Sequence, residues 1–275
     1  MKKLILVIAV LLVATGIIWY AINTAPVESE QLVVTGSATL APLMQDIAER
    51  YQSLHPRAQI AIQANNSLQG VADVRQGTAD IGLVSRDPSM QEKDLNWFML
   101  AKDGIGVIVH KDNPITALTD KQIAAIFTGD ITRWDAAGGN SAGITTVNAA
   151  EGNSSRTVFV KYFGIKAAEL AQGPIIGYNE QIIKTVAGNP AAIGYASLGI
   201  AEQMAKQGTA IKLLPLESVT ASMENVRRGR YPLTRTLNLV TRSAPQGLAK
   251  RFIDYTLSRE AAALIKAHGF IPAAK

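Results

Sequence analysis

The sequence predicts an α/β fold of two lobes. Short apolar segments typical of buried strands alternate with segments whose apolar residues recur at helical spacing. The alternation runs from about residue 30 to the C-terminus and predicts about ten strands, which favours two lobes over one large sheet. With 275 residues, 48% of them hydrophobic, the chain is long enough to bury a sizeable core.

The expected elements follow from apolar periodicity and helix-ending glycines. Because strands and helices alternate, we expect a largely parallel sheet. The expected strands are residues 32–34, 60–62, 81–84, 106–109, 144–147, 193–196, 211–214 and 236–240. The expected helices are residues 43–51, 71–76, 121–127, 156–163 and 180–187, with further helices in 248–267.

The N-terminus is typical of an exported protein. Lys2 and Lys3 precede an uncharged apolar run over residues 4–22, as in a signal peptide. The run approaches the ~20 residues that span a bilayer, so two alternatives stay open, cleavage near Ala25 and a retained anchor. Residues 1–30 are therefore interpreted as signal or anchor plus linker, and the protein as periplasmic, either free or tethered to the inner membrane.

Composition excludes several classes of function. The chain has no cysteine, which excludes disulfides, a lipid-bearing cysteine and thiolate chemistry. No two histidines stand at metal-ligand spacing, and no Gly-x-x-x-x-Gly-Lys-[Ser/Thr] loop is present. We therefore expect no metal and no cofactor. The net charge of +5 suits an anionic ligand, whereas an exported chain with 6% aromatic residues is not expected to bind nucleic acid.

Three loops place small hydroxyl residues at the start of a helix. They are residues 34–42, 64–70 and 151–155. Free N–H groups of a first helical turn attract anions, and serine and threonine hydroxyls add adjustable donors. Each loop alone is explained by an ordinary N-cap. Their repetition favours a site for a tetrahedral oxyanion.

A fourth segment adds a positive charge. Residues 80–86 form a buried strand that ends in Ser85 and Arg86. Ligands in α/β folds lie beyond the carboxyl ends of strands, where a guanidinium can hold an oxyanion through two hydrogen bonds. The alternative is a surface pair between Arg86 and Asp87.

These segments together resemble the phosphate-binding proteins of ABC importers. The matching motifs are Thr-Gly-Ser-Ala-Thr-Leu-Ala-Pro at 35–42, Asn-Ser at 66–67, Asp-Ile-Gly at 80–82 with Ser-Arg at 85–86, Ile-Phe-Thr-Gly at 126–129 with Arg-Trp at 133–134, Ala-Ile-Gly-Tyr at 192–195 and Tyr-Pro-Leu-Thr-Arg at 231–235. The resemblance implies the type II periplasmic binding protein fold, with two crossover segments near 106–110 and 234–239. Lobe one would comprise residues 31–105 and 235–275, and lobe two residues 106–234.

The resemblance also implies a phosphate site in the cleft between the lobes. The third loop departs from the family pattern, because Ala149 stands where the family has an arginine; Arg156 lies nearby. Monohydrogen phosphate, unlike sulfate, can donate a proton to a carboxylate, and Asp87 and Glu151 are the nearest candidates in the sequence. The implied ligand-binding residues are Ser37, Ala38, Thr39, Leu40, Ser67, Ser85 and Arg86 from lobe one and Asn153, Ser154 and Ser155 from lobe two.

The sequence thus predicts a monomeric binding protein, not an enzyme, that closes over phosphate and presents it to the membrane subunits of an ABC importer. A membrane-tethered binder or sensor of another oxyanion is the first alternative, and a retained anchor would favour it. A serine hydrolase is the second, with Ser154 or Ser155 as nucleophile and one of the three histidines (His55, His110, His268) as base. The chain has no Gly-x-Ser-x-Gly elbow to support it.

Overall fold

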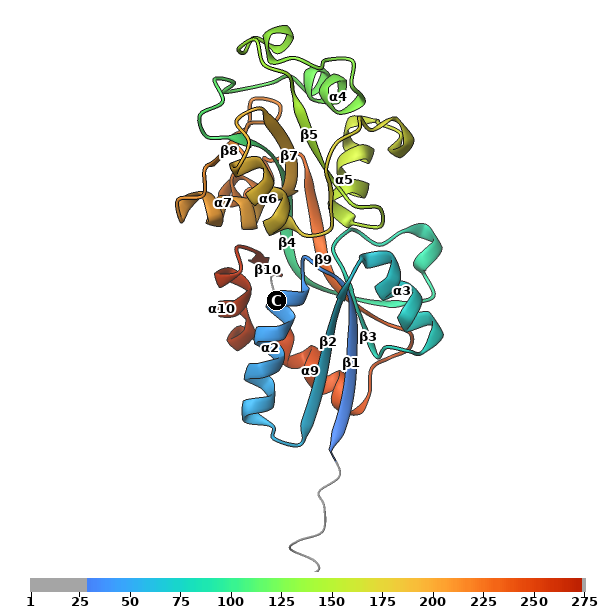
Figure 1. Cartoon of the computed structure of the whole chain (residues 1–275). Helices are drawn as coiled ribbons and strands as arrows, with labels where there is room; N and C mark the ends of the chain where they lie inside the picture. The colour runs from blue at the N-terminus through green and yellow to red at the C-terminus, as the bar shows by residue number, and fades with distance from the viewer. Residues whose placement is uncertain (1–28, 274–275) are drawn as a thin grey trace, which may run out of the picture.

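The computed structural model describes residues 29–273. They form two α/β lobes that are stacked end to end and joined by the long strands β4 and β9 (Figure 1). The predicted signal or anchor over residues 4–22 lies outside the described residues. Within 29–273, no helix combines the length and the apolar character needed to cross a bilayer.

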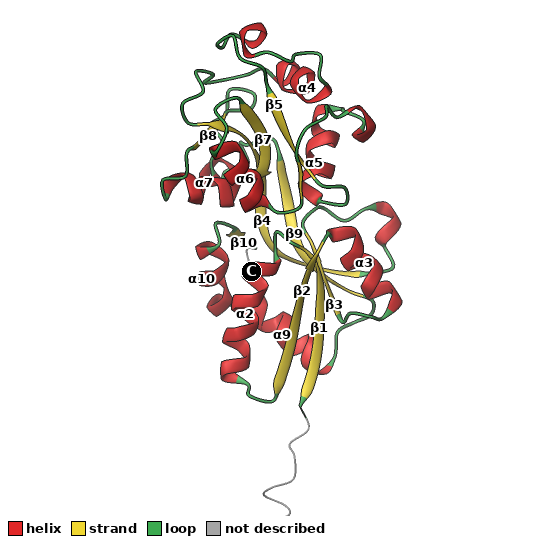
Figure 2. Cartoon of the chain, viewed as in Figure 1, coloured by secondary structure: helices red, strands yellow, loops and turns green. Residues whose placement is uncertain are grey.

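Lobe one is built around three strands that run parallel to one another. Strand β1 lies between β2 and β3. Helices α2, α9 and α10 cover one face of this sheet and α3 covers the other (Figure 2). The elements are β1 (Glu30–Ser37), α2 (Ala41–Leu54), β2 (Ala58–Asn65), α3 (Ser67–Gln76), β3 (Ile81–Val84), α9 (Gly247–Thr256), α10 (Arg259–Ala267) and β10 (Ile271–Pro272).

Lobe two repeats this plan around β5 and β7, which also run parallel. Helices α6 and α7 lie on one side of its sheet and α4 and α5 on the other (Figure 1). The elements are α4 (Asp120–Thr128), β5 (Thr145–Ala149), α5 (Ser154–Phe163), β6 (Ile175–Ile176), α6 (Asn179–Ala187), β7 (Ala192–Ser197), α7 (Leu198–Lys206), β8 (Ile211–Leu214) and α8 (Met223–Arg227). Short 3-10 turns cover Met90–Glu92, Trp134–Ala137 and Ala167–Glu169.

Strands β4 (Asn96–His110) and β9 (Thr234–Thr241) connect the lobes. The first part of β4 pairs with β9, and from Ile105 onward β4 pairs with β7 and β8. All of these pairings are antiparallel, and so is the pairing of β3 with β9. The sheet is therefore mixed, and the expectation of a largely parallel sheet was wrong. A strand that crosses from one lobe to the other does not follow the strand–helix–strand repeat that keeps strands parallel.

Two large hydrophobic cores lie on either side of this connection. The core of lobe two takes its buried residues from the range 105–233, and the core of lobe one from 32–101 and 237–270. The rings of Phe127, Phe159 and Tyr195 pack against one another in lobe two, with Phe159 stacked on Tyr195 at 3.9 Å between ring centroids. Each lobe thus has its own packed interior, and the polar residues described below lie where the two lobes meet.

Candidate anion-binding site between the lobes

Four helices begin at the junction of the lobes. Helices α2 and α3 of lobe one and α5 and α6 of lobe two have their N-terminal ends there, as contacts between their first residues show. Ser154, the first residue of α5, donates a hydrogen bond of 2.6 Å to Ser67, the first residue of α3. Asn179, the first residue of α6, donates one of 3.0 Å to Thr39, just before α2. The predicted loops therefore converge from both lobes.

Four buried serines form the centre of this junction, and we call Ser37, Ser67, Ser85 and Ser154 the serine cluster. Ser37 ends β1, Ser85 follows β3, and their hydroxyls are hydrogen-bonded to each other. The Ser85 N–H donates to Ser67 Oγ at 3.1 Å. All four residues are at most 4% exposed. The serines predicted from the three loops and from the end of β3 thus share one hydrogen-bonded network.

Glycine allows the lobe-one loops to approach closely. Gly36 precedes Ser37 and has φ 127°, a conformation that favours glycine. A Cβ atom at Gly36 would lie 2.4 Å from the carbonyl oxygen of Leu83 and 3.1 Å from the Cα of Gly70. The absence of a side chain therefore lets the end of β1 lie against both β3 and α3, which brings their serines together.

The remaining residues of the first loop contact three different parts of the chain. The N–H of Ala38 donates to Asn65 O at 2.9 Å, and that of Leu40 donates to Ser37 O at 3.0 Å. The Leu40 side chain is fully buried and anchors the start of α2. The N–H groups of Ala38 and Leu40 thus have partners within lobe one, and the part of these two residues in ligand binding stays a prediction. The Thr39 hydroxyl accepts the hydrogen bond from Asn179 of lobe two.

In the third loop, the three predicted residues have different partners. Asn153 caps α5, accepting from Ser155 N at 2.8 Å, and donates to Gly177 O at 2.9 Å. The Asn153 side chain therefore shapes the loop, whereas Ser154 belongs to the serine cluster. Ser155 is fully buried and accepts a hydrogen bond from Arg235 at 3.2 Å.

Arg235 is the cation at this site, and sequence reasoning missed it. Its Nε and Nη2 donate to Asp103 Oδ2 at 3.1 and 2.8 Å, and both side chains are completely buried. Its Nη1 donates to Ser155 and, at 3.4 Å, to the carbonyl oxygen of Ser85. Arg235 thus lies between β4, the end of β3 and the start of α5. The available signal was the pair of opposite charges in two apolar strand segments, which the register of β4 and β9 places opposite each other.

Arg86, the cation predicted from the sequence, has other partners. Its Nη1 and Nη2 donate to Glu92 at 2.9 and 2.5 Å, and Nη1 also donates to the carbonyl oxygen of Asp87. The hydrogen bond from Arg86 is the largest cause that lowers the pKa of Glu92 to about 2. Glu92 in the following 3-10 turn therefore holds the Arg86 guanidinium, and the expectation that Arg86 clamps the ligand stays a prediction.

The structure also places the two carboxylates considered as proton acceptors. Asp87 Oδ1 accepts from the N–H and the hydroxyl of Thr236 at 3.2 and 2.7 Å, and Asp87 is exposed. Glu151 is exposed as well. Neither carboxylate is hydrogen-bonded to the serine cluster.

Lobe two has no arginine at position 149, and Ala149 and Arg156 both make contacts outside the serine cluster. Ala149 is fully buried, and its N–H donates to the Tyr195 hydroxyl at 3.2 Å. Burial raises the pKa of Tyr195 to about 12, so this hydroxyl stays neutral. Arg156 donates to Ala167 O at 3.1 Å and makes no hydrogen bond to the serine cluster. The positive charge at the junction therefore comes from β9 rather than from the third loop.

The three histidines considered as bases lie elsewhere. His110 Nδ1 accepts from the N–H of Asp112 at 3.1 Å, and the His268 ring is 2.7 Å from Asp46. The His55 ring packs against Tyr51 in lobe one. None of these rings is hydrogen-bonded to Ser154 or Ser155, so the nucleophile–base pair of a serine hydrolase is not assembled among the described residues.

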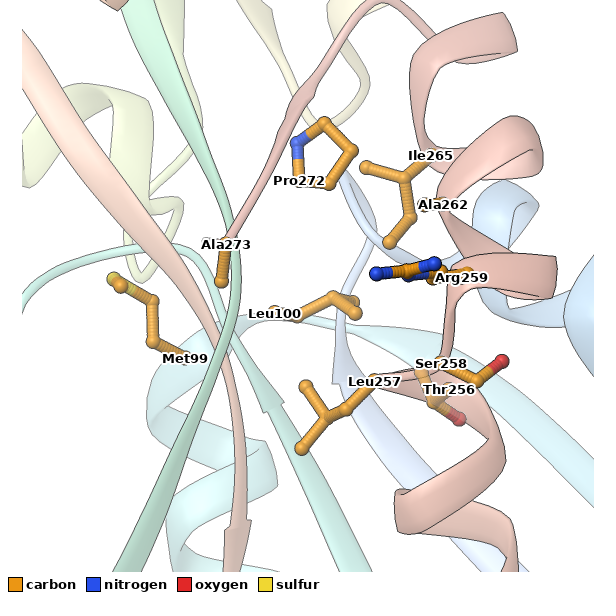
Figure 3. A pocket seen from close by; sticks show the side chains of 10 residues that line it. All are labelled: Met99, Leu100, Thr256, Leu257, Ser258, Arg259, Ala262, Ile265, Pro272 and Ala273. Atoms are coloured by element: carbon orange, nitrogen blue, oxygen red, sulfur yellow. The ribbon is translucent and has the colours of Figure 1, made fainter. Parts of the chain in front are cut away.

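Among the hollows that lie outside the serine cluster, two differ in the charge of their lining. One, of about 370 Å³, lies in lobe one between α10, β4 and β10, and Arg259 is the only charged residue among the described residues that line it (Figure 3). The other is a groove of about 870 Å³ in which Arg86 and Glu92 of lobe one face Lys161 and Tyr162 of lobe two. The groove explains where Arg86 lies, beside the junction but outside its hydrogen-bond network.

A family model and the sequences of known proteins both match most of this chain. The family model described as PBP superfamily domain matches residues 23–260. The phosphate-binding protein PstS of Bacillus subtilis (strain 168) is 29% identical over 249 residues, which cover 89% of this chain and 81% of PstS.

Solved structures of proteins from the same kind of transport system also match this chain. A putative phosphate ABC transporter substrate-binding protein with bound phosphate from Clostridium perfringens matches with a TM-score of 0.81 and 32% identity over 89% of this chain and all of that one. An ABC-type phosphate transport receptor from Vibrio cholerae matches with a TM-score of 0.75 and 28% identity over the same shares. The predicted family resemblance and the two-lobed fold are confirmed. These relatives are named as binding proteins and receptors, not as enzymes.

Proposed function

Because this chain belongs to the PBP superfamily, we propose that it binds phosphate between its two lobes and presents it to the membrane subunits of an ABC importer. The observation that carries the proposal is the junction itself. Four serines and Arg235 contribute from three loops, the end of β3 and a crossover strand, and hydrogen bonds join both lobes across the junction. A small oxyanion with several acceptor oxygens would replace these mutual contacts with contacts to itself.

The electrostatics of the junction suit such a ligand. The N-terminal ends of α2, α3, α5 and α6 each contribute about half a positive charge, and backbone N–H groups at helix starts bind anions. Asp103 balances the charge of Arg235, so attraction of the anion would come from dipoles, hydroxyls and the remaining N–H of the guanidinium. Phosphate, rather than another oxyanion, is proposed from the names of the relatives.

We further propose that the protein acts in the periplasm as a monomer. The charged and apolar N-terminus over residues 2–22 supports export. Whether the protein is free or tethered is decided by N-terminal sequencing of the mature protein: a start near residue 26 indicates a free protein, and a start at Met1 indicates a tethered one.

Isothermal titration of the full chain, dialysed free of phosphate, tests the proposed ligand. We expect a one-to-one heat signal with a dissociation constant of about 1 μM or tighter, which corresponds to about −8 kcal/mol. Small-angle scattering should show a smaller radius of gyration with phosphate, because the lobes close on the ligand. Chloride at equal ionic strength is the control. No heat and no thermal shift with phosphate, arsenate or sulfate would refute the proposal.

A further inference from the structure

We infer that this site does not select phosphate over sulfate by means of the ligand's proton, so that it accepts fully ionised tetrahedral dianions as a class. The inference rests on the proposed function and concerns which oxyanions the same site takes. A protein that requires the proton of monohydrogen phosphate presents a carboxylate to it, because that carboxylate repels sulfate. The question is therefore whether the serine cluster contains a free carboxylate.

Asp103 is a buried carboxylate beside the cluster, and both of its oxygens have partners. Asp103 Oδ2 accepts two hydrogen bonds from Arg235, and Oδ1 accepts one from the N–H of Gly199 at 3.2 Å. With these three donors around it, Asp103 is committed to holding the guanidinium. A proton from the ligand would have to compete with that ion pair.

The other nearby carboxylates have partners elsewhere, are exposed, or make no hydrogen bond to the cluster among the described residues. Glu92 is paired with Arg86, and Asp73 accepts from Thr35 and Gln69. Asp87 and Glu151 are exposed. Glu180, next to Asn179 in α6, makes no hydrogen bond to the cluster in the described part of the chain.

The groups that remain are hydroxyls and N–H donors. Each of the four serine hydroxyls can donate one hydrogen bond and accept others, so it can receive a ligand proton when one is present and donate when none is. Such a group repels neither monohydrogen phosphate nor sulfate. We therefore expect the two dissociation constants to lie within about tenfold of each other, or about 1.4 kcal/mol.

Competition between the two anions tests this inference. Titrations of the full chain with phosphate and with sulfate are run at mildly alkaline pH and equal ionic strength, where phosphate carries one proton and sulfate none. Binding of both within about tenfold supports the inference. Phosphate binding with sulfate at least about hundredfold weaker overturns it and leaves the proposed function intact. Absence of binding by either anion refutes the proposed function.

A designed carboxylate provides the converse test. Ser85→Asp places a carboxylate within the serine cluster, and Ser85→Asn is the uncharged control of similar size. We expect Ser85→Asp to weaken sulfate binding at least about tenfold more than phosphate binding, and Ser85→Asn to weaken both alike. Equal losses of sulfate binding and of phosphate binding in Ser85→Asp contradict the inference. The inference is also contradicted if the unmodified chain selects phosphate over sulfate and Glu180→Gln abolishes that selection. If Ser85→Asp does not fold, the titrations of the unmodified chain still decide.

Discussion

Two arginine–carboxylate pairs near the junction have different roles. Arg86 and Glu92 are six residues apart and close within lobe one, whereas Arg235 and Asp103 are 132 residues apart and join β9 to β4. The Arg86 guanidinium donates to Glu92, which lies in the 3-10 turn that follows it. Arg235 keeps Nη1 directed at Ser155 of lobe two and Ser85 of lobe one. An arginine can contribute to a binding site only when its carboxylate partner leaves some of the guanidinium N–H groups directed at that site. Its position in the sequence alone does not show this.

The largest expected effect comes from removing the second pair's cation. Arg235→Met leaves Asp103 buried without its counter-ion, which costs about 3–5 kcal/mol of unfolding free energy. Because the variant also removes the donor to Ser155 and Ser85, phosphate affinity should fall about hundredfold or more. Urea denaturation and titration calorimetry measure the two effects.

Arg235→Lys keeps this prediction testable if the methionine variant does not fold. Lysine preserves the charge but not the planar fork of donors, so stability should recover more than affinity does. Full affinity in Arg235→Lys would contradict the idea that the geometry of the guanidinium matters.

The first pair should show itself as a dependence of stability on pH. The pKa of Glu92 in the folded protein is about 2, below the ordinary value of about 4.3 in an unfolded chain. Its stabilising contribution, on the order of 2 kcal/mol, is therefore complete above that ordinary value and is lost as the pH falls toward 2.

Comparison with Glu92→Gln isolates this one group from the other carboxylates. The difference in unfolding free energy between the unmodified chain and Glu92→Gln should be largest near neutral pH and should shrink as the solution is acidified from about pH 5 toward about pH 2. A difference that does not change with pH would mean that Arg86 does not depress this pKa.

Much of the fold could be predicted because it follows from local patterns. The expected strands coincide with β1 to β5 and β7 to β9, apart from residue 144, which lies just before β5, since each is a short segment rich in apolar residues. The first half of β4 was missed because Lys102 and Asp103 interrupt its apolar run. Helix α7 was missed because it begins directly after Ser197, without a polar loop to mark its start. The antiparallel pairings depend on contacts between distant segments, which no local pattern contains.

The candidate site also has one part that local sequence patterns predict and another that depends on contacts between distant segments. The serine positions could be predicted because each lies at a junction of strand and helix in its own segment. Arg235 could not, because its role depends on the pairing of β9 with β4. Arg86 was chosen for its place at the end of a strand, and the capping turn from Ser89 to Glu92 then determined its partner.

A smaller effect is expected from the contact that joins the two lobes directly. Ser154→Ala removes the hydroxyl that donates to Ser67 across the junction while leaving the start of α5 capped by Asn153. Loss of one such hydrogen bond costs about 1 kcal/mol, so phosphate affinity should fall about fivefold. Ser53→Ala, at an exposed serine bonded only to Arg50 O, is the control and should leave the titration unchanged. Equal effects of the two substitutions would exclude a role for Ser154.

The smallest expected effect separates the two arginines most sharply. Arg86→Met is the same substitution as Arg235→Met, made at a pair whose side chains are also mostly buried, at 12% and 7% exposed. It should lower the unfolding free energy, since Glu92 loses its partner. It should change phosphate affinity by less than about twofold, because no donor of Arg86 is directed at the serine cluster and charge at a distance is screened by salt. Titration calorimetry at physiological ionic strength measures this, with Arg235→Met in parallel. A hundredfold loss in Arg86→Met would show that Arg86 exchanges Glu92 for the ligand, and the sequence-based choice of cation would then be the right one.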